Sequence, residues 1–165
     1  MKKALLTSII FFFWSHIAYA NCSEKNYQEF DFWLGEWQVT SEVDDIVRFN
    51  RISKINNGCT ILEEYSSPSG YTGKSLNIYD QQTKKWHQTW TDSSGLLLQL
   101  QGGFKQGSMV MAGETISKDQ QKVLNRISWT PNKDGSVRQH WKISQDNGKT
   151  WQTAFDGIYR KVSKK

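Results

Sequence analysis

Short segments rich in Val, Ile, Tyr and Trp recur about every ten residues after residue 35, separated by clusters of Gly, Asn, Asp or Ser. Evenly spaced short strands with turn signals between them are typical of an all-β sandwich or barrel. No segment between them has a helical pattern long enough for the crossover that parallel pairing requires. The sequence therefore predicts an all-β protein, a single meandering antiparallel β-barrel of about ten strands with a short N-terminal helix.

The clearest alternation lies in 36–43, where Trp37, Val39 and Val43 share one face. The Asn-Asn-Gly run at 56–58 is a strong hairpin signal. A closed barrel also removes the unpaired edges of an open sheet, which favours closure. The expected strands run over 36–43, 46–55, 59–66, 74–80, 85–91, 96–104, 107–116, 122–130, 136–144 and 150–161.

The segment 23–34 precedes the first strand and has the composition of a short helix or helical turn. Ser23 is placed to cap it, and residues such as Tyr27, Phe30 and Trp33 supply an apolar surface. We expect this segment to lie across one end of the barrel.

The beginning of the chain has the pattern of an export signal. Two lysines precede an apolar run over 5–14, and an A-x-A cleavage site ends at Ala20. The apolar run is shorter than the roughly 20 residues that span a bilayer. We therefore expect removal of 1–20, no transmembrane segment afterwards, and a single exported domain over 21–165, periplasmic or secreted from a bacterium.

Two cysteines, Cys22 and Cys59, follow the predicted signal. In an oxidising compartment two cysteines are expected to form one disulfide. The loop-entropy model gives such a bridge about 3–4 kcal/mol. Two free thiols are the alternative that the sequence leaves open.

Residues that carry chemistry are few. Only two histidines, His87 and His140, follow the predicted signal, whereas a structural zinc site uses about four ligands. Glu63 and Glu64 are adjacent, so on a strand they face opposite sides and do not form a carboxylate pair, although one of them can point inward. No phosphate loop, nucleophile elbow or zinc-protease motif occurs. The sequence predicts no catalytic residue, no metal and no cofactor.

Charge gives little indication of a partner. The whole chain has a formal net charge of +5, two charges of which belong to the predicted signal. No basic stripe has the spacing of a nucleic-acid surface, so we expect no nucleic-acid partner. The oligomeric state is not predicted.

The segment 144–151 matches the pattern S-x-D-x-G-x-T-W at every specified position. It resembles the Asp-box of sialidases and related β-proteins, where the motif braces a hairpin and is not the active site. Asp146 is expected to accept backbone N–H bonds within the turn, Gly148 to supply a positive φ, and Trp151 to pack beneath. We interpret the motif as structural, joining the last two strands.

The middle strands allow two assignments of their faces. In one, the faces that carry Trp86, Trp129 and Trp141 form the core, and His87, Thr89, Arg126 and His140 point outward. In the other, the inner wall is mixed, and His87, Arg126 and His140 converge on an anion or carbonyl group of an interior ligand. Alternation alone does not decide, because a one-residue bulge moves a strand's side chains to the opposite face.

Several segments together resemble a widespread family of uncharacterised secreted bacterial proteins. The resemblance covers nearly all of the chain after the predicted signal and implies no activity, since none is assigned to that family. It is carried by FDFWLGEW at 30–37, NGC at 57–59, LNIYD at 76–80, WHQTW at 86–90 and FDGIYR at 155–160.

A second resemblance is to the calycin superfamily, which includes lipocalins, fatty-acid-binding proteins and nitrobindin-like barrels. Those proteins have Gly-x-Trp on the first strand and a late Arg that stacks on this Trp, and Gly35, Trp37 and Arg160 occupy the matching places here. The resemblance implies a cation–π contact at the barrel floor and an interior pocket for a small, largely apolar molecule. Nitrobindin-like members bind haem through a late histidine, but His140 does not align firmly with that ligand, and haem is not assigned.

These features together predict an exported barrel that binds an apolar or amphipathic small molecule without transforming it. Two alternatives stay open: a small isomerase or hydrolase that uses His87 or Glu63 in the barrel pocket, and a module that recognises glycans or the cell envelope through exposed Trp residues. The candidate pocket residues are Asn77, His87, Thr89, Arg126 and His140.

Overall fold

The computed structural model describes residues 22–41 and 44–162 of the 165-residue chain. The predicted signal over 1–20 and its cleavage site lie outside these residues, as does the end of the first predicted strand.

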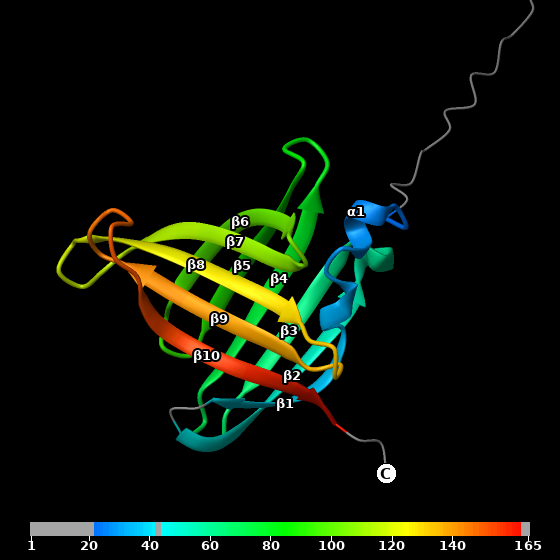
Figure 1. The fold of residues 1–165 in the computed structure, drawn as a ribbon, viewed down its shortest axis with the longest axis horizontal. Coiled ribbons are helices and arrows are strands. Elements are labelled where there is room, and N and C mark those ends of the chain that lie inside the picture. Colours follow the sequence, from blue (N-terminus) through cyan, green and yellow to red (C-terminus); the bar gives the residue numbers. More distant parts are fainter. Residues whose placement is uncertain (1–21, 42–43, 163–165) are drawn as a thin grey trace, which may run out of the picture.

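Ten antiparallel strands form a closed barrel in which each strand pairs with its neighbours in sequence and β10 returns to pair with β1 (Figure 1). The predicted all-β barrel with a short N-terminal helix is confirmed. Most strand bounds lie within two residues of the expected ones. The strands are β1 (Gly35–Ser41), β2 (Asp44–Ile55), β3 (Thr60–Ser66), β4 (Thr72–Asp80), β5 (Lys85–Asp92), β6 (Leu97–Lys105), β7 (Ser108–Ile116), β8 (Lys122–Pro131), β9 (Val137–Ser144) and β10 (Gln152–Lys161).

Two short helical pieces lie at one end of the barrel, α1 (Lys25–Gln28) and the 3₁₀ turn η1 (Asp31–Trp33) (Figure 1). The residue at the N-cap of α1 is Glu24, so the prediction of Ser23 in that position is wrong. No helix within the described ranges has the length and apolar character needed to cross a membrane. We call the barrel end next to α1 the closed end and the opposite end the open end.

Aromatic side chains fill the interior beside the closed end. Phe30 stacks on Trp33 at 4.8 Å between ring centroids and makes edge contacts with Trp86 at 5.7 Å and Trp129 at 5.3 Å. Trp37 is buried beside them and donates from its indole nitrogen to the Trp33 carbonyl at 2.9 Å. These five side chains are at most 1% exposed. We call them the closed-end core; because its members come from η1, the residue before it and distant strands, it ties the N-terminal segment to the barrel.

The predicted disulfide between Cys22 and Cys59 is confirmed. Cys22 is buried just before α1, and Cys59 immediately precedes β3. The bridge therefore attaches the segment that covers the closed end to the barrel wall.

The predicted contact of Arg160 with Trp37 is not formed, because Lys161 takes that place. Lys161 lies directly opposite Trp37 in the β1–β10 register, and its Nζ is 5.3 Å from the indole centroid. Residues opposite each other on antiparallel strands share a face, so Arg160 is on the other face. Arg160 is exposed there, and its guanidinium donates to Thr40 Oγ1 at 3.3 Å.

The β9–β10 turn is braced by the side chain of Asp146. One carboxylate oxygen accepts from the Ser144 hydroxyl at 2.7 Å and from the Thr150 amide at 2.9 Å, and the other accepts from the Thr150 hydroxyl at 2.6 Å. The hydroxyl and amide of Thr150 and the Ser144 hydroxyl hold the pKa of Asp146 at about 2. Gly148 has a φ of 87°, and the Trp151 indole donates to its carbonyl.

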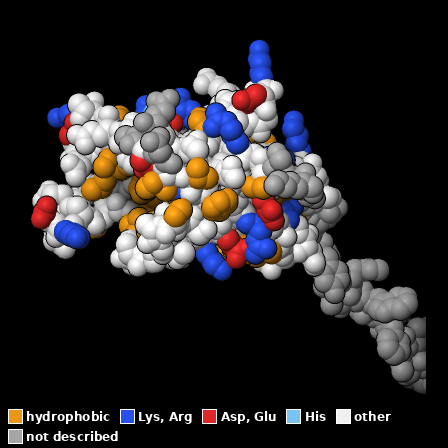
Figure 2. Space-filling model, turned by 90° about the horizontal axis from the view of Figure 1, so that it is seen from below, with side chains coloured by type: hydrophobic (Ala, Val, Ile, Leu, Met, Phe, Trp, Pro, Cys, Tyr) orange, Lys and Arg blue, Asp and Glu red, His pale blue; other side chains and the backbone are white. Residues whose placement is uncertain are grey.

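The outer wall carries several exposed hydrophobic side chains. Phe49 on β2 is 48% exposed, and Leu76 and Ile78 on β4 are 51% and 41% exposed. Figure 2, which views the molecule from below, shows hydrophobic side chains gathered across the middle of that face, with charged side chains around them.

Candidate functional site

A cavity of about 190 Å³ lies inside the barrel, between the closed-end core and the open end. Its wall is formed by residues of β3, β5, β6, β8, β9 and β10, together with Tyr71 from the connection between β3 and β4. The cavity reaches the surface beside Tyr71 and Ala154, which are both exposed. The barrel is therefore filled at one end and hollow toward the other.

Glu63 forms part of the cavity wall and is only 3% exposed. Its Oε1 accepts from Asn50 Nδ2 at 2.7 Å, and its Oε2 accepts from the Ser75 hydroxyl at 2.6 Å. The neighbouring Glu64 points outward, where Arg51 and Lys74 bind it. The predicted opposite orientation of the two carboxylates is confirmed, and the inward one is Glu63.

A chain of hydrogen bonds leads from β5 to the Glu63 carboxylate. Gln88 Nε2 donates to Asn77 Oδ1 at 2.8 Å, Asn77 Nδ2 donates to the Ser75 hydroxyl at 2.9 Å, and Ser75 donates to Glu63. Asn77 also donates to the Ile61 carbonyl. Every link along this route donates toward Glu63, an arrangement that favours the ionised carboxylate.

On the opposite side of Glu63, Asn50 leads to Tyr159. Asn50 Nδ2 lies 3.4 Å from the Tyr159 hydroxyl, which in turn donates to Gln139 Oε1. Asn50 Oδ1 is buried and receives no hydrogen bond from the described residues. The network around Glu63 therefore retains an unused acceptor.

Burial raises the pKa of Glu63 from an ordinary 4.5 to about 7, although the hydrogen bonds from Ser75 and Asn50 act in the opposite direction. Within the described residues no Lys, Arg or His forms an ion pair with this carboxylate. The carboxyl group is thus hydrogen-bonded but has no countercharge.

Aromatic rings lie on the open-end side of this polar layer. On β3, β5 and β9, an aromatic residue of the cavity wall lies two positions from a polar one, on its open-end side. The pairs are Glu63 and Tyr65, Gln88 and Trp90, and Gln139 and Trp141, and Phe155 on β10 is a further aromatic wall residue. Tyr65 meets Trp90 edge to face at 6.0 Å. A molecule that enters the cavity therefore meets aromatic walls before it reaches the polar floor.

Two glycines make room for these rings. A Cβ on Gly73 would lie 2.2 Å from the Trp90 ring, and one on Gly157 would lie 2.5 Å from the Phe155 ring. Neither position tolerates a larger side chain unless the neighbouring ring moves. The cavity wall therefore depends on small residues of β4 and β10 that do not line it.

Asp92 holds the rim of the cavity. One of its carboxylate oxygens accepts from the Tyr71 hydroxyl at 2.7 Å and from the Trp90 indole at 3.2 Å, and the other accepts from Ser94. Burial opposes ionisation, but these hydrogen bonds together lower the pKa of Asp92 below its ordinary value. The Trp90 and Tyr71 side chains are thereby fixed at the opening.

The structure places four of the five predicted pocket residues on the outer face of the barrel. The prediction that they converge inside it is therefore wrong. Trp86 and Gln88 are buried, which directs His87 and Thr89 outward, and Arg126 is exposed between buried Asn125 and Ile127. The first assignment of the faces, with the tryptophans in the core, is the correct one. Among the five residues only Asn77 faces the interior, where it is fully buried behind the cavity wall.

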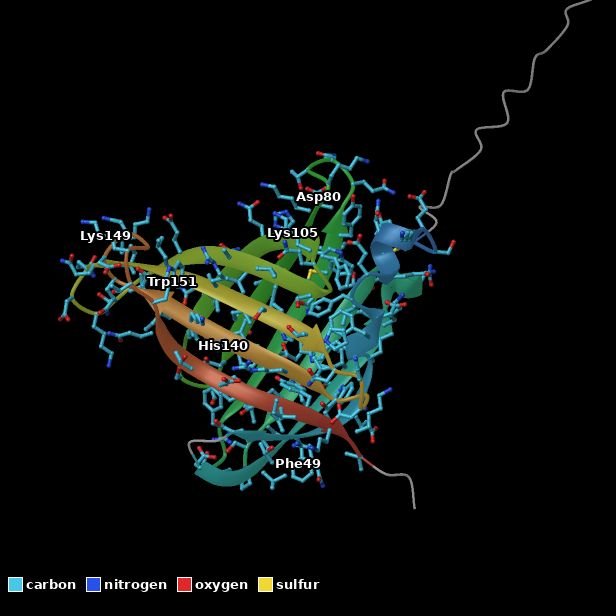
Figure 3. The ribbon with its side chains drawn as sticks, in the orientation of Figure 1. Phe49, Asp80, Lys105, His140, Lys149 and Trp151 are labelled. Atoms are coloured by element: carbon cyan, nitrogen blue, oxygen red, sulfur yellow. A yellow bond between two sulfur atoms is a disulfide. The ribbon has the colours of Figure 1, made fainter. Side chains whose placement is uncertain are left out.

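Three of these residues nevertheless meet on an outer groove. His87, Thr89 and Arg126 line a concave surface over β5 to β8, and Arg126 lies 4.3 Å from the centroid of the Trp151 ring. Figure 3 labels Trp151 near the β9–β10 turn. The prediction that His87, Thr89 and Arg126 bind a ligand was made for the barrel interior, and these residues lie on the outer wall.

His140 lies on β9, apart from both hollows (Figure 3). Its ring nitrogen Nε2 is 3.0 Å from the Thr153 hydroxyl, and burial lowers its pKa. Since its neighbours Gln139 and Trp141 line the cavity, its own ring is on the outer face and does not reach an interior haem or ligand. No cluster of three or more His, Cys, Asp or Glu residues suited to a metal occurs in the described ranges.

Sequence reasoning missed most of the polar interior. A signal was present, because inward positions of three successive strands hold polar residues where a filled barrel would have apolar ones: Asn50, Glu63, Ser75 and Asn77. Recognising that signal requires the register that places these residues side by side.

Neither a scan against protein-family models nor a search of curated proteins found a match for this chain.

Proposed function

We propose that this protein is a small-molecule-binding barrel whose amphipathic ligand enters at the open end and occupies the interior cavity. The observation that carries the proposal is a cavity with two unlike ends: aromatic walls beside the opening and a polar floor at Glu63, Gln88 and Gln139. Ligand sites in proteins are mostly apolar hollows with a few polar groups that fix orientation.

The size of the cavity limits the ligand. An apolar cavity of about 150 Å³ holds benzene, so the 190 Å³ here suits a molecule with one ring and a short polar substituent. A long fatty acid exceeds this space. The ligand is therefore smaller and more polar at one end than the sequence alone indicates.

Two further expectations fit this proposal. A closed barrel that begins with Gly-x-Trp after a helical turn supports a calycin-like relationship. The cation over Trp37 at the closed end is Lys161 instead of Arg160. The Cys22–Cys59 disulfide supports export to an oxidising compartment, periplasmic or extracellular.

A second candidate is an enzyme that uses Glu63 as a general base. The observation in its favour is a buried carboxyl group with a pKa of about 7 at the wall of a cavity. It lacks a titratable partner in hydrogen-bond contact, since Asn50 and Ser75 are its neighbours. A binding role needs no such partner, and His87 on the outer wall does not contribute one.

The glycan-recognition alternative needs exposed, coplanar tryptophans. Every tryptophan within the described ranges is buried or half-buried, and the half-buried Trp90 and Trp141 line the interior cavity. The remaining half-buried one, Trp151, has Arg126 over its ring. The geometry therefore favours the interior site.

The test is calorimetric titration with a set of single-ring compounds that have one polar substituent. Leu98 lines the cavity and Leu97 is exposed on the outer wall, so Leu98→Trp fills the site and Leu97→Trp is its matched control. We expect binding to the natural chain and to Leu97→Trp, and its loss in Leu98→Trp.

Ala154→Trp narrows the opening without adding bulk among the buried residues, so it gives the same test if Leu98→Trp does not fold. Failure of every compound to bind the natural chain would contradict the proposal. Recovery of a chemically altered compound after incubation would favour the enzyme candidate instead.

A further inference from the structure

The only charged side chain among the described residues of the cavity wall is acidic. Glu63 is its single acidic residue, and no Lys, Arg or His lines it within the described part of the chain. The other ionisable wall groups are Tyr65, Tyr71 and Tyr159, each of which has a pKa raised by burial and stays neutral. An anionic ligand would lie next to a carboxylate without compensation, whereas a cation would supply the missing countercharge.

Arg48, a cation toward the open end of the barrel, already has a partner. Arg48 on β2 lies toward the open end, where it makes a two-fold contact with the Asp44 carboxylate at 2.6 and 2.9 Å. Its side chain is not part of the cavity wall. Glu63 therefore has no partner of opposite charge among the residues that the structure describes.

The hydrogen-bond capacity of the site also calls for a donor. A carboxylate has about four acceptor positions, and the described residues fill two of them, from Asn50 and Ser75. Asn50 Oδ1 beside it is a further buried acceptor without a donor. A ligand group that carries several N–H bonds supplies what this network lacks.

The aromatic wall is suited to a positive charge as well. Tyr65, Trp90, Trp141 and Phe155 surround the approach to Glu63, and ring faces attract cations. Within the described ranges, Lys and Arg lie over only Trp37 and Trp151. The rings that line the cavity are thus unoccupied by protein cations.

We propose, on the basis of the binding function above, that the ligand is a small organic ammonium ion, a primary amine with a single ring, whose ammonium group binds the Glu63 carboxylate while its ring packs between Trp90 and Trp141. The cavity volume of 190 Å³ suits a molecule of this size.

Three probes of nearly equal size test the charge of the ligand: benzylamine, benzyl alcohol and benzoate, titrated by calorimetry at about pH 8, where Glu63 is ionised. We expect benzylamine to bind about tenfold to a hundredfold more tightly than benzyl alcohol, because a hydrogen bond between charged groups is stronger than one between neutral groups. Benzoate should be the weakest of the three.

Glu63→Gln and Glu64→Gln form a matched pair of variants, one inside the barrel and one on its outer wall. Glu63→Gln should reduce benzylamine binding to the level that benzyl alcohol shows in the same variant. Glu64→Gln should preserve the difference between the two probes. If Glu63→Gln does not fold, the pH dependence of the natural chain gives the same test.

Lowering the pH to about 5.5 protonates Glu63 and should weaken benzylamine binding, while benzyl alcohol binding stays constant. Near Glu63, Tyr65 and Tyr159 stay neutral over this range, and Asp44, whose pKa is lowered by Arg48, stays ionised.

Equal affinity for amine and alcohol at both pH values would overturn the ammonium ligand but leave the binding function in place. Failure of all three probes and of every neutral single-ring compound would instead overturn the binding function.

Discussion

The two halves of the barrel interior use aromatic residues in different ways. At the closed end, Phe30, Trp33 and Trp129 pack against one another and leave no exposed surface. Toward the open end, Trp90 and Trp141 line a cavity, and polar side chains joined by hydrogen bonds form its inner end. The comparison shows how a small barrel can combine a packed half with a hollow one: the closed end supplies the packing energy, and the other half can then hold a cavity and a buried carboxyl group.

The largest expected effect compares the same truncation in the two halves. Phe30→Ala removes a fully buried ring from the closed-end core and should lower the free energy of unfolding by about 3–5 kcal/mol. Phe155→Ala removes a half-buried ring beside an existing cavity and should cost distinctly less. Urea unfolding of both variants measures the difference, and equal losses would break the distinction between the halves.

The next effect concerns Glu63 and depends on pH. Its pKa is about 7 in the folded chain and near 4.5 when exposed, so the folded state retains a proton that the unfolded state has already lost. The natural chain should therefore lose stability as the pH rises from about 4.5 to about 7, by up to about 3 kcal/mol. Glu63→Gln should remove this loss, so the variant is the more stable chain at about pH 8 and nearly equal to the natural one at about pH 4.5.

Glu64→Gln is the control for this pH profile. Hydrogen bonds from Arg51 and Lys74 lower the pKa of Glu64, so its contribution is present at neutral pH and is lost in acid, opposite in sign to that of Glu63. Thermal unfolding across the pH range measures both profiles. A stability difference between Glu63→Gln and the natural chain that does not grow from about pH 4.5 to about pH 7 would contradict the burial of an unpaired carboxyl at Glu63.

The smallest effect tests which residue covers the closed end. Lys161→Met removes the cation over the Trp37 ring and should lower the free energy of unfolding by about 0.5–1 kcal/mol. Arg160→Met, on the outer face, should change it less. Urea titrations of the two variants compare their losses in free energy of unfolding. A larger loss for Arg160→Met would support the arginine contact that the calycin resemblance implies.

Much of the fold was predictable because its signals are local. Alternation and turn residues located the strands closely, and Cys22 paired with Cys59 as an oxidising compartment favours. The site was predictable only in part. Asn77 faces inward as expected, but His87 and His140 were chosen for their chemistry and lie on the outer wall, since the tryptophans beside them take the interior positions.

The sequence by itself determined the strand order, the antiparallel meander and the turn at Asp146, because each depends on residues that are neighbours along the chain. Only the tertiary structure decided that Lys161 faces Trp37, that Glu63 is buried with Asn50 and Ser75, and that a cavity stays open between Trp90 and Trp141. Those features follow from barrel closure, which sets the register of distant strands and the volume that their inward side chains must share.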